Sequence, residues 1–401
     1  MAGEGTLSPT TPDGVLAAVQ AAVADRAPLI VRGRGTKDGL GHAVASNRVL
    51  DLSGLTGVTL YEPEELVLSA LAGTPMAEIE ALLDANGQEL AFEPPMRHLI
   101  WGLEDAGTIG GAVMVNAAGP RRVKAGAARD HVLGMKAVSG RGEAFKAGGR
   151  VVKNVTGYDL SKGLAGSFGT LAVATEITVK VLPKAETTAT LVLHGLSDRD
   201  AVAALAEAMG APVEAAGAAH LPAGVATALD LTEAATVVRL EGVEPSVAAR
   251  FERLATILRP RGRITRLEAA ESAALWRALR DGLLFSQDRL LPLWRVSVAP
   301  TAGPSVAEAA QAAAVAYDWA GGLVWLAMDP AEPDAGAARI RAAVKAAGGG
   351  HATLMRGSDA LRAAVPVFEP EMPSVAALTG RLRHQFDPLG VLNPGRMGAG
   401  R

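Results

Sequence analysis

The sequence contains no cysteine among its 401 residues. The chain by itself therefore forms no disulfide, ligates no iron–sulfur cluster through cysteine and carries no reactive thiol. Aromatic residues are also scarce, at 4% of the chain. No apolar run is long enough to cross a bilayer as a helix, because the best candidate, residues 312–328, is interrupted by Asp318 and a glycine pair.

An excess of charge of either sign is missing too. The chain has 39 basic and 42 acidic residues, which gives a net charge of -3 at pH 7. The chain therefore lacks the excess of basic residues that attracts nucleic acid or an anionic membrane, and we expect neither as a direct partner. The first twenty residues lack a basic stretch followed by an apolar one, so no secretory signal is indicated and a cytoplasmic location is expected.

What the sequence does have is glycine, at 46 residues, and enough length for two domains. In the first half, the apolar spacing from Asp13 predicts a helix, and a short strand with a glycine loop follows in "PLIVRGRGTK". A second helix is expected over 75–87, with Gly87 as its cap. Residues 131–148 look like a hairpin, and 175–183 alternate as a half-buried strand that ends at Pro183.

The second half alternates strands with alanine-rich helices, which indicates an α+β domain. Strands are expected in "TATLVLHG", "TVVRLEG", "LWRVSVAP" and "GLVWLAM". Helices are expected at about 198–209, 244–258, 269–281 and 304–316. The final stretch, "FDPLGVLNPGRMGAGR", is rich in proline and glycine and has no periodicity.

Four glycine-bearing segments stand out, at 32–37, 107–120, 125–130 and 161–170. Any one of them alone is explained by a tight turn. Together, and beside predicted strands, they indicate a site in which backbone amides of several loops converge on an anion such as a diphosphate. Neither the P-loop spacing nor the Rossmann glycine fingerprint is present, so a nucleotide would be held in another way.

The segments "VRGRGTK", "AGTIGGAVMVNAAGP", "GAARDHVLGMKAVSGRGE", "KNVTGYDLSKGLAGSFGTLAVATEITVKVLP" and "FDPLGVLNPGRM" resemble the FAD-binding domain of the vanillyl-alcohol oxidase/p-cresol methylhydroxylase (PCMH) superfamily. The resemblance covers about 28–183 and the tail. Within that superfamily, "AGPRRVKAGAARDHVLG" and "VVKNVTGYDLSKGLAGSFGTL" are most similar to the E-subunit (FAD-binding subunit) family of bacterial glycolate oxidase.

The resemblance implies an α+β fold. A two-subdomain PCMH-type FAD-binding domain at 1–184 would be followed by a smaller α+β cap domain with an antiparallel sheet at 185–385, which would also contact partners. A C-terminal tail at 386–401 would return to the flavin. The implied cofactor-binding residues are Arg32, Gly33, Arg34, Gly35, Thr36, Lys37, Pro95, Gly107, Thr108, Ile109, Gly110, Gly111, Asn116, Gly119, Gly126, Asp130, Gly166, Gly169, Thr170, Leu171, Val173 and Asn393.

Two details of the implied site depend on single positions. Some relatives link the flavin covalently through a histidine in the first loop, where this chain has Thr36, so noncovalent FAD is expected. Larger side chains at Gly166 or Gly169 are expected to occupy cofactor volume, whereas Gly163 is open to a simple packing explanation. Asn393 is implied to approach the flavin ring, with an Asn-Pro turn at a frayed end as the alternative.

The catalytic residues are not indicated by the sequence. Oxidation of a 2-hydroxy acid requires an anchor for the carboxylate, and Arg295, Arg129 and Lys153 are candidates, each with a structural role as the alternative. The seven histidines are scattered without a metal-binding spacing, so no metal site is expected. Related D-2-hydroxy-acid dehydrogenases carry a metal-binding His-x-Gly-Asp-Gly-Asn-type segment, whereas "GGGHATLMRG" offers only His351, which a glycine turn before a strand also explains.

The resemblance therefore implies an FAD-dependent oxidoreductase that oxidises glycolate to glyoxylate as one subunit of a complex. The expected partners are a larger FAD-binding catalytic subunit and an iron–sulfur subunit, through which the chain could lie at the periphery of the inner membrane. Two alternatives stay open. The chain is a self-sufficient FAD-dependent oxidoreductase of 2-hydroxy acids such as D-lactate or of alcohols, or it is a non-catalytic scaffold with a retained flavin fold.

Overall fold

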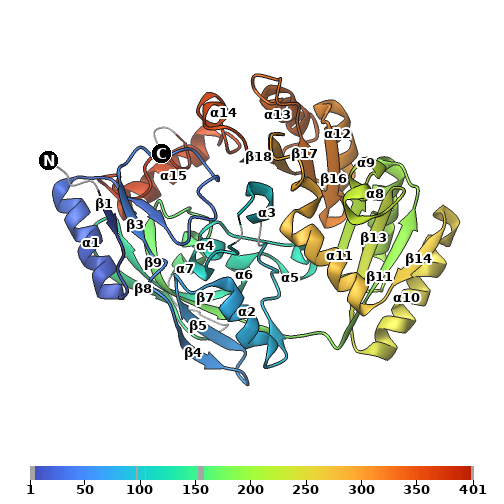
Figure 1. Cartoon of the computed structure of the whole chain (residues 1–401), viewed down its shortest axis with the longest axis horizontal. Coiled ribbons are helices and arrows are strands. Elements are labelled where there is room, and N and C mark those ends of the chain that lie inside the picture. Colours follow the sequence, from blue (N-terminus) through green and yellow to red (C-terminus); the bar gives the residue numbers. More distant parts are fainter. Residues whose placement is uncertain (1–4, 96–97, 104, 152–157, 399–401) are drawn as a thin grey trace.

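A computed structural model describes residues 5–95, 98–103, 105–151 and 158–398 (Figure 1). The chain begins with a small parallel sheet in the strand order β1-β3-β2, formed by β1 (Gly5–Leu7), β3 (Arg48–Asp51) and β2 (Ile30–Arg32). The predicted first helix is α1 (Pro12–Asp25), whose N-terminus is capped by the Thr11 hydroxyl. Its buried face, with Val15 and Val19, packs against Leu50 of β3.

A five-stranded antiparallel sheet follows, in the order β4-β5-β9-β7-β8. Its strands are β4 (Val58–Glu62), β5 (Val67–Leu71), β9 (Ala172–Lys180), β7 (Val132–Ser139) and β8 (Ala144–Gly148). The β7–β8 pair is the predicted hairpin. Helices α2 (Met76–Asp84), α4 (Ile109–Met114) and α7 (Leu160–Leu164) supply Ile79, Val113 and Leu164 to the core on this sheet. Short elements complete this half: β6 (Gln88–Glu89), α3 (His98–Trp101), α5 (Arg122–Ala125), α6 (Ala128–His131) and β10 (Leu182–Pro183).

Two local predictions in this half are corrected. Helix α2 ends at Ala85, which is its C-cap, and Gly87 with φ 63° lies two residues beyond it. Strand β9 lies in the centre of its sheet and is buried on both faces, so the prediction of a half-buried strand is wrong. Thr178, on the face expected to be polar, is buried, and its hydroxyl lies 2.7 Å from the Ser69 hydroxyl. A polar side chain is tolerated there because this hydrogen bond satisfies it.

The second half is built on an eight-stranded antiparallel sheet in the order β14-β11-β13-β12-β16-β17-β15-β18. Its strands are β11 (Thr187–His194), β12 (Gly217–Leu221), β13 (Ala235–Gly242), β14 (Ile264–Leu267), β15 (Leu293–Ser297), β16 (Ala314–Asp318), β17 (Leu323–Ala327) and β18 (His351–Arg356). Its helices, together with those that follow it, are α8 (Asp198–Gly210), α9 (Ala223–Ala226), α10 (Glu244–Leu258), α11 (Ala269–Asp281), α12 (Gly303–Ala310), α13 (Ala337–Ala346), α14 (Asp359–Ala364) and α15 (Pro373–Phe386).

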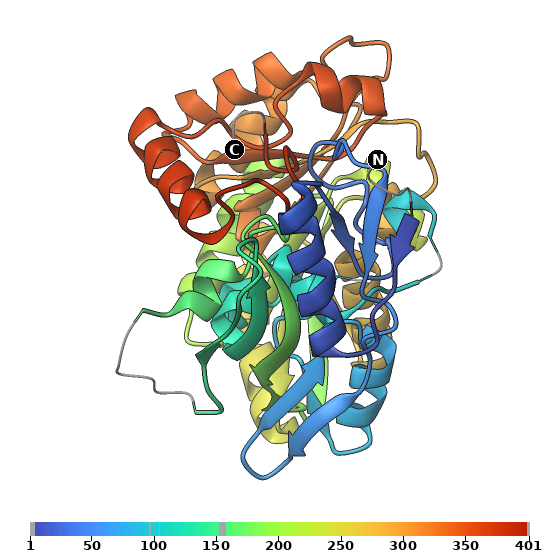
Figure 2. The same cartoon turned by 90° about the vertical axis from the view of Figure 1, so that its left-hand side faces the viewer.

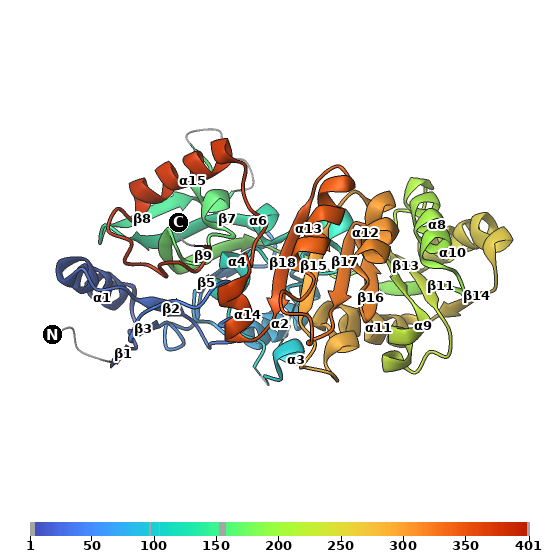
Figure 3. The ribbon, with the colours of Figure 1, turned by 90° about the horizontal axis from the view of Figure 1, so that it is seen from above.

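Helices cover both faces of the eight-stranded sheet. Alternation along β13 shows this, because Val238 and Leu240 join the core under α8 and α10, whereas Val237 joins the core under α9 and α11. Seen from above, α8, α10, α12 and α13 lie on one side of the sheet and α9 and α11 on the other (Figure 3). The helix predicted over 304–316 is wrong in its second half, since α12 ends at Ala310 and Ala314–Asp318 is strand β16. Burial of Tyr317 in the sheet outweighs the helix propensity of the alanines.

The C-terminal segment returns to the first half of the chain (Figure 2). Leu392 forms a parallel bridge with Leu29, and the Leu29 amide donates to the Val391 carbonyl at 2.8 Å. The α15 helix lies against the β7–β8 hairpin, where the Phe386 and Phe145 ring centroids are 5.9 Å apart. The C-terminal segment therefore packs beside β2, and α15 packs on the β7–β8 hairpin.

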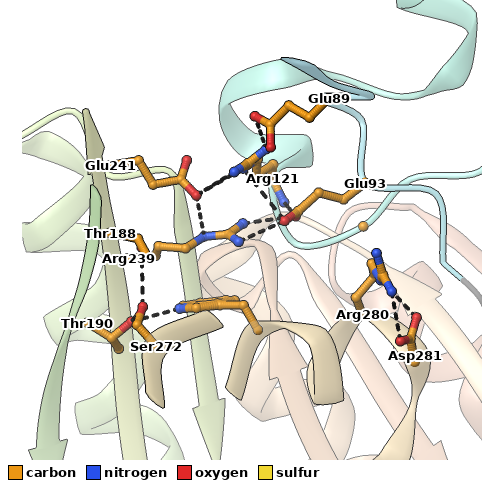
Figure 4. A network of polar contacts seen from close by, with 12 residues as sticks. Glu89, Glu93, Arg121, Thr188, Thr190, Arg239, Glu241, Ser272, Arg280 and Asp281 are labelled. Atoms are coloured by element: carbon orange, nitrogen blue, oxygen red, sulfur yellow. Dashed lines mark hydrogen bonds and ion pairs between the residues drawn. The ribbon is translucent and has the colours of Figure 1, made fainter. Parts of the chain in front are cut away.

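A cluster of buried charges joins the two halves near their connecting segment (Figure 4). The guanidinium of Arg239, on β13, donates to both carboxylate oxygens of Glu93 at 2.7 and 2.9 Å. Arg121, which follows α4, donates to Glu241 at 2.7 Å and pairs with Glu89. Burial alone raises the pKa of Glu93, but the two arginines outweigh it and hold that pKa below its usual range. The first half thus contributes Glu93 and Arg121, and the second half Arg239 and Glu241.

Replacing Glu93 by Gln should destabilise the fold by about 3 kcal/mol, because Arg239 then loses its bidentate partner and shares the single carboxylate of Glu241 with Arg121. Since the pKa of Glu93 is lowered in the folded chain, the stabilisation that it provides is complete at neutral pH and is lost as pH falls below about 4. Urea unfolding at pH 7 and pH 4 measures both effects. The control is Glu207→Gln, which removes an exposed pair with Arg261 and should change stability by less than about 0.5 kcal/mol. Equal effects of the two substitutions would contradict the prediction.

Candidate active site

The first glycine loop leaves β2 at Arg32 and exposes a series of unused backbone donors. Among the described residues, the amides of Gly33, Arg34, Gly35 and Thr36 donate no hydrogen bond. Gly35 has φ 73°, a left-handed conformation that glycine adopts without strain, and this turns the loop back toward Asp38. Successive free amides in a tight loop form a concave anion-binding site of the kind that holds phosphates.

The second glycine segment is packed against the first but uses its amides internally. A Cβ on Gly107 would lie 2.5 Å from the Thr36 hydroxyl, so the two loops touch. At the start of α4, the amides of Ile109 and Gly110 donate to the carbonyls of Thr74 and Ala72 at 3.1 and 2.9 Å. The Gly111 amide donates to the Thr108 hydroxyl at 3.1 Å. The first loop therefore has the free amide donors, and the second loop packs behind the first.

An ion pair fixes the first loop on the second. Arg34 pairs with Asp105, whose other oxygen accepts the Gly107 amide at 2.7 Å. Burial raises the pKa of Asp105, but the Gly107 amide and the Arg34 charge together bring it below the usual value. Asp105 is consequently ionised at neutral pH and holds the two loops together.

The fourth glycine segment, residues 161–170 before β9, lines the same cleft. Phe168 and Gly169 both have positive φ, 55° and 68°, and the Phe168 amide donates to the Met114 carbonyl at 2.9 Å. Strand β5 pairs with β9 only from Glu176 onward, so along 172–174 the backbone of β9 has a strand partner on the β7 side alone. These residues form the floor of the cleft.

Asn393 closes the cleft from the C-terminal segment and is buried. Its side-chain oxygen accepts the Val31 amide at 2.8 Å, and its side-chain nitrogen donates to the Phe168 carbonyl at 2.9 Å. A Cβ on Gly169 would lie 3.0 Å from that nitrogen. Asn393 therefore links β2 to the fourth glycine segment. It does begin a turn, since the Arg396 amide donates to its carbonyl at 3.1 Å, but its burial and side-chain hydrogen bonds contradict a frayed end.

These segments enclose a cleft of about 720 Å³, which is partly open to solvent. Its walls are mainly apolar with backbone donors at one end, which is the character of small-molecule and cofactor sites. A dinucleotide with an anionic centre and flat rings fits such walls. The predicted residues that line this cleft are Arg32, Gly33, Arg34, Gly35, Thr36, Lys37, Thr108, Gly110, Gly111, Gly169, Val173 and Asn393.

A larger cavity of about 1770 Å³ adjoins the cleft, with Thr36, Lys37 and Phe168 in both walls. It lies between the first half of the chain and the β15–β18 edge of the large sheet. Of the other predicted residues, Pro95, Asn116 and Gly166 line it.

Two arginines and a tryptophan form one wall of the cavity. The guanidinium groups of Arg122 and Arg295 each lie 4.9 Å from the ring centroid of Trp319. The Trp319 indole donates to the Gly119 carbonyl at 3.0 Å, which joins the two halves of the chain beside the cavity. The Arg295 Nε atom is buried and has no hydrogen-bond partner among the described residues. Burial, reinforced by Arg122, lowers the pKa of Arg295 to about 10 against the opposing effect of Asp318.

The other predicted residues lie outside both walls and have local contacts. Gly107 touches Thr36, the Asp130 carboxylate accepts the Ala127 amide beside Gly126, and Gly119 packs on the Glu93 backbone. Ile109 and Leu171 are core residues, and the Thr170 hydroxyl donates to the Ser167 carbonyl. The candidate anchor Arg129 is exposed and away from the cavity, and Lys153 lies outside the described residues. His351 begins β18, as a turn before a strand would place it, and lines the cavity.

Sequence reasoning missed Arg122, Trp319 and Arg396. Arg396 lines the cleft and donates to the carbonyls of Asp38 and Leu40 at 3.0 Å each. Arg122 follows a Gly-Pro turn and Trp319 follows Asp318 before a glycine pair, and such turn contexts are the only local signal that marks them. Across the described ranges, no group of three or more potential metal ligands is present, and no helix is both long and apolar enough to cross a membrane.

Comparisons with known proteins agree with this geometry. The family described as "FAD binding domain" matches residues 4–148. The glycolate oxidase subunit GlcE of Escherichia coli is 35% identical over 385 residues, which cover 96% of each chain. A D-lactate dehydrogenase of Anaerostipes hadrus is 31% identical over 161 residues, 40% of this chain and 32% of that protein. In fold, the chain is similar to p-cresol methylhydroxylase with substrate bound, at a TM-score of 0.74 and 14% identity over 98% of this chain and 88% of that one.

The predicted fold class and cofactor are confirmed by these matches. The chain belongs to the PCMH-type FAD-binding oxidoreductases, in the family of the glycolate oxidase subunit GlcE, and its cofactor is FAD.

Proposed function

We propose that this chain is the FAD-binding subunit of a multi-subunit glycolate oxidase, which oxidises glycolate to glyoxylate. The observation that carries the proposal is the cleft with free loop amides, which adjoins a cavity lined by the half-buried side chain of Arg295. The identity of 35% to the glycolate oxidase subunit GlcE along nearly the whole of both chains supports the same function.

The cofactor would be held by the backbone of the first loop. The amides of 33–36 would bind the diphosphate, and the Arg34–Asp105 pair keeps them in place against the second loop. The Ala172–Ala174 backbone and Asn393 would border the rings. The first loop has Thr36, not histidine, at the position of covalent attachment in some relatives, so the flavin would be dissociable.

The substrate would bind in the large cavity. Its carboxylate matches the charge of Arg295, whose side chain lines the cavity. Bound FAD supplies the acceptor for the hydride that leaves the CH–OH carbon. The stacking of Arg295 on Trp319 holds the guanidinium against the indole face.

Electrons would leave through partner subunits. The sequence has no cysteine to ligate an iron–sulfur cluster, so a one-electron relay requires another chain. A larger FAD-binding catalytic subunit and an iron–sulfur subunit are the proposed partners, and peripheral association with the inner membrane would occur through them.

A second candidate function is a self-sufficient oxidoreductase of larger 2-hydroxy acids. The large cavity has more room than glycolate requires, and the D-lactate dehydrogenase match covers 40% of this chain. Activity of the isolated chain decides between the two candidates.

To test the proposed function, the chain is purified alone and after co-expression with the other two subunits from its host. The flavin spectrum should be present in both samples, and acid precipitation should release all flavin to the supernatant. Glycolate oxidation with an artificial electron acceptor should be at least tenfold higher in the co-expressed complex. Full activity of the isolated chain, with D-lactate as the comparison substrate, would favour the second candidate. A colourless chain would contradict both.

Two adjacent glycines should separate cofactor binding from folding. Gly111→Leu places a side chain in the cleft, since a Cβ there makes only ordinary contacts, at 3.4 Å or more. This variant should keep its melting temperature without added FAD but lose most bound flavin. Gly110→Ala should instead lower the melting temperature, because its Cβ would lie 2.6 Å from the Ala72 carbonyl oxygen. Full flavin occupancy in the Gly111 variant would contradict the assignment of the cleft.

Arg295→Met should raise KM for glycolate at least tenfold in the assembled enzyme, because a charge-assisted contact is lost. It should also stabilise the chain by the order of 1 kcal/mol, since the lowered pKa means that folding disfavours the charged form. For the same reason, KM of the unaltered enzyme should rise as pH increases through about 10, whereas the variant shows no such step. Arg129→Met, on the exposed surface, is the control. An unchanged KM would exclude Arg295 as the anchor.

A further inference from the structure

The backbone that carries Trp319 is strained. Trp319 and Ala320 both adopt left-handed conformations, with φ 52° and 58°, and Gly321 follows with φ 98°. A bulky residue rarely adopts this conformation, and such strain persists only where the surrounding structure enforces it, commonly at binding sites. The turn 319–321, directly after β16, is therefore a candidate for a functional role.

This turn holds the Trp319 indole at the contact between the two halves of the chain. The side chain is buried, and its N–H donates to the Gly119 carbonyl at 3.0 Å. Arg122, from the first half, and Arg295, from β15 of the second half, each lie 4.9 Å from the ring centroid. All three side chains line the large cavity. The indole is thus the support that holds one cation from each half at the cavity wall.

The two cations of this wall are not neutralised by the chain. Among the residues that the structure describes, neither guanidinium has a hydrogen-bond or ion-pair partner. Burial and the like charge of Arg122 both lower the pKa of Arg295, and Asp318 opposes them. Asp318 is buried and accepts the Trp319 amide at 2.7 Å. Two positive charges thus face one carboxylate, and an anion between them would relieve their repulsion.

The two carboxylates that line the cavity have other contacts. Glu369 accepts the Ala352 amide at 3.0 Å and lies 3.9 Å from the Arg341 guanidinium. Glu371 accepts the Thr379 hydroxyl at 3.2 Å. Within the described ranges, neither carboxylate forms an ion pair with the two arginines of the wall. A ligand in the cavity is therefore the partner that remains for these arginines.

The spacing of the two guanidinium groups suits a short dianion. Because both central carbons lie 4.9 Å from one centroid, they are at most twice that distance apart. A four-carbon dicarboxylate with a guanidinium at each end spans up to about 12 Å between the guanidinium carbons, from N–H···O contacts of about 2.8 Å and carbon–carbon bonds of about 1.5 Å. Such a ligand, slightly bent, contacts both arginines at once, whereas glycolate has only one carboxylate.

We propose that Arg122 is a second anion contact of the substrate site, so that the site accepts 2-hydroxy acids with a second carboxylate. One carboxylate binds Arg295 and the other binds Arg122. The inference rests on the proposed function, which assigns Arg295 as the anchor of the first carboxylate. The second carboxylate is a binding group only, and the oxidation at the CH–OH carbon is unchanged. Since the two arginines come from different halves, such a ligand bridges the halves beside the flavin cleft.

The first test compares two ligands of equal chain length that are not oxidised. Succinate has a carboxylate where butanoate has a methyl group. Both are titrated into the FAD-loaded chain at low ionic strength, and binding is measured by calorimetry and by the flavin absorbance. Succinate should bind at least tenfold more tightly than butanoate. Arg122→Met should remove this preference without changing the affinity for butanoate or the melting temperature, because the Arg122 side chain is exposed.

The second test uses the matching pair of substrates in the assembled enzyme, D-malate and D-2-hydroxybutanoate. Arg122→Met should lower kcat/KM for D-malate at least tenfold and leave kcat/KM for D-2-hydroxybutanoate unchanged. The control is Lys124→Met, on the same helix α5. Lys124 pairs with Glu214 and does not line the cavity, so its substitution should change neither value.

The other outcomes contradict the inference in separate ways. Equal binding of succinate and butanoate to the unaltered chain overturns the second contact and leaves the proposed function intact. A preference for succinate that survives in Arg122→Met assigns it to another cation of the cavity, such as Lys37, and also overturns the inference. Failure of the complex to oxidise any 2-hydroxy acid overturns the proposed function and the substrate class with it, whereas the titrations still decide whether Arg122 binds an anion.

Discussion

The paired charges of Glu93, Arg121 and Arg239 are the constraint on which the arrangement of the two halves depends. A bidentate carboxylate–guanidinium pair has a strong directional preference, so it fixes orientation as well as distance. Pro95, two residues after Glu93, and Arg122, directly after Arg121, both line the large cavity. The shape of that cavity is therefore set by a polar network outside it, and hydrophobic packing alone could not define the angle between the sheets so closely.

The glycines of the cleft serve different physical purposes. Gly35 provides a left-handed turn, Gly110 allows the helix to approach the Ala72 carbonyl, and Gly163 has open space where its side chain would be. Only positions such as Gly111, with room beside them in the cleft, keep volume for a ligand. A glycine-rich sequence thus indicates that another group comes close to the backbone. The structure is needed to tell at which glycines that group belongs to the chain itself.

Much of the fold could be predicted because its signals are local. The helices at 244–258 and 269–281 follow from apolar spacing, and the loop at 32–37 follows from glycines after a buried strand. Strand β16 could not be predicted, because alanine favours helices and only burial between β12 and β17 decides its state. The contact of Arg122 and Arg295 with Trp319 was equally hidden, since Arg122 lies about two hundred positions before Trp319 and Arg295 on a different strand, and no periodic pattern relates them.

The link formed by Asn393 has a consequence for biosynthesis. Its partners include Val31, 362 positions earlier in the sequence, and Arg396 reaches the first loop at Asp38. During translation the first loop emerges early, yet its cleft lacks a wall until the C-terminal segment has left the ribosome. A nascent chain therefore has no complete cleft, and under the proposed function FAD would be loaded late, into full-length molecules whose cleft has closed.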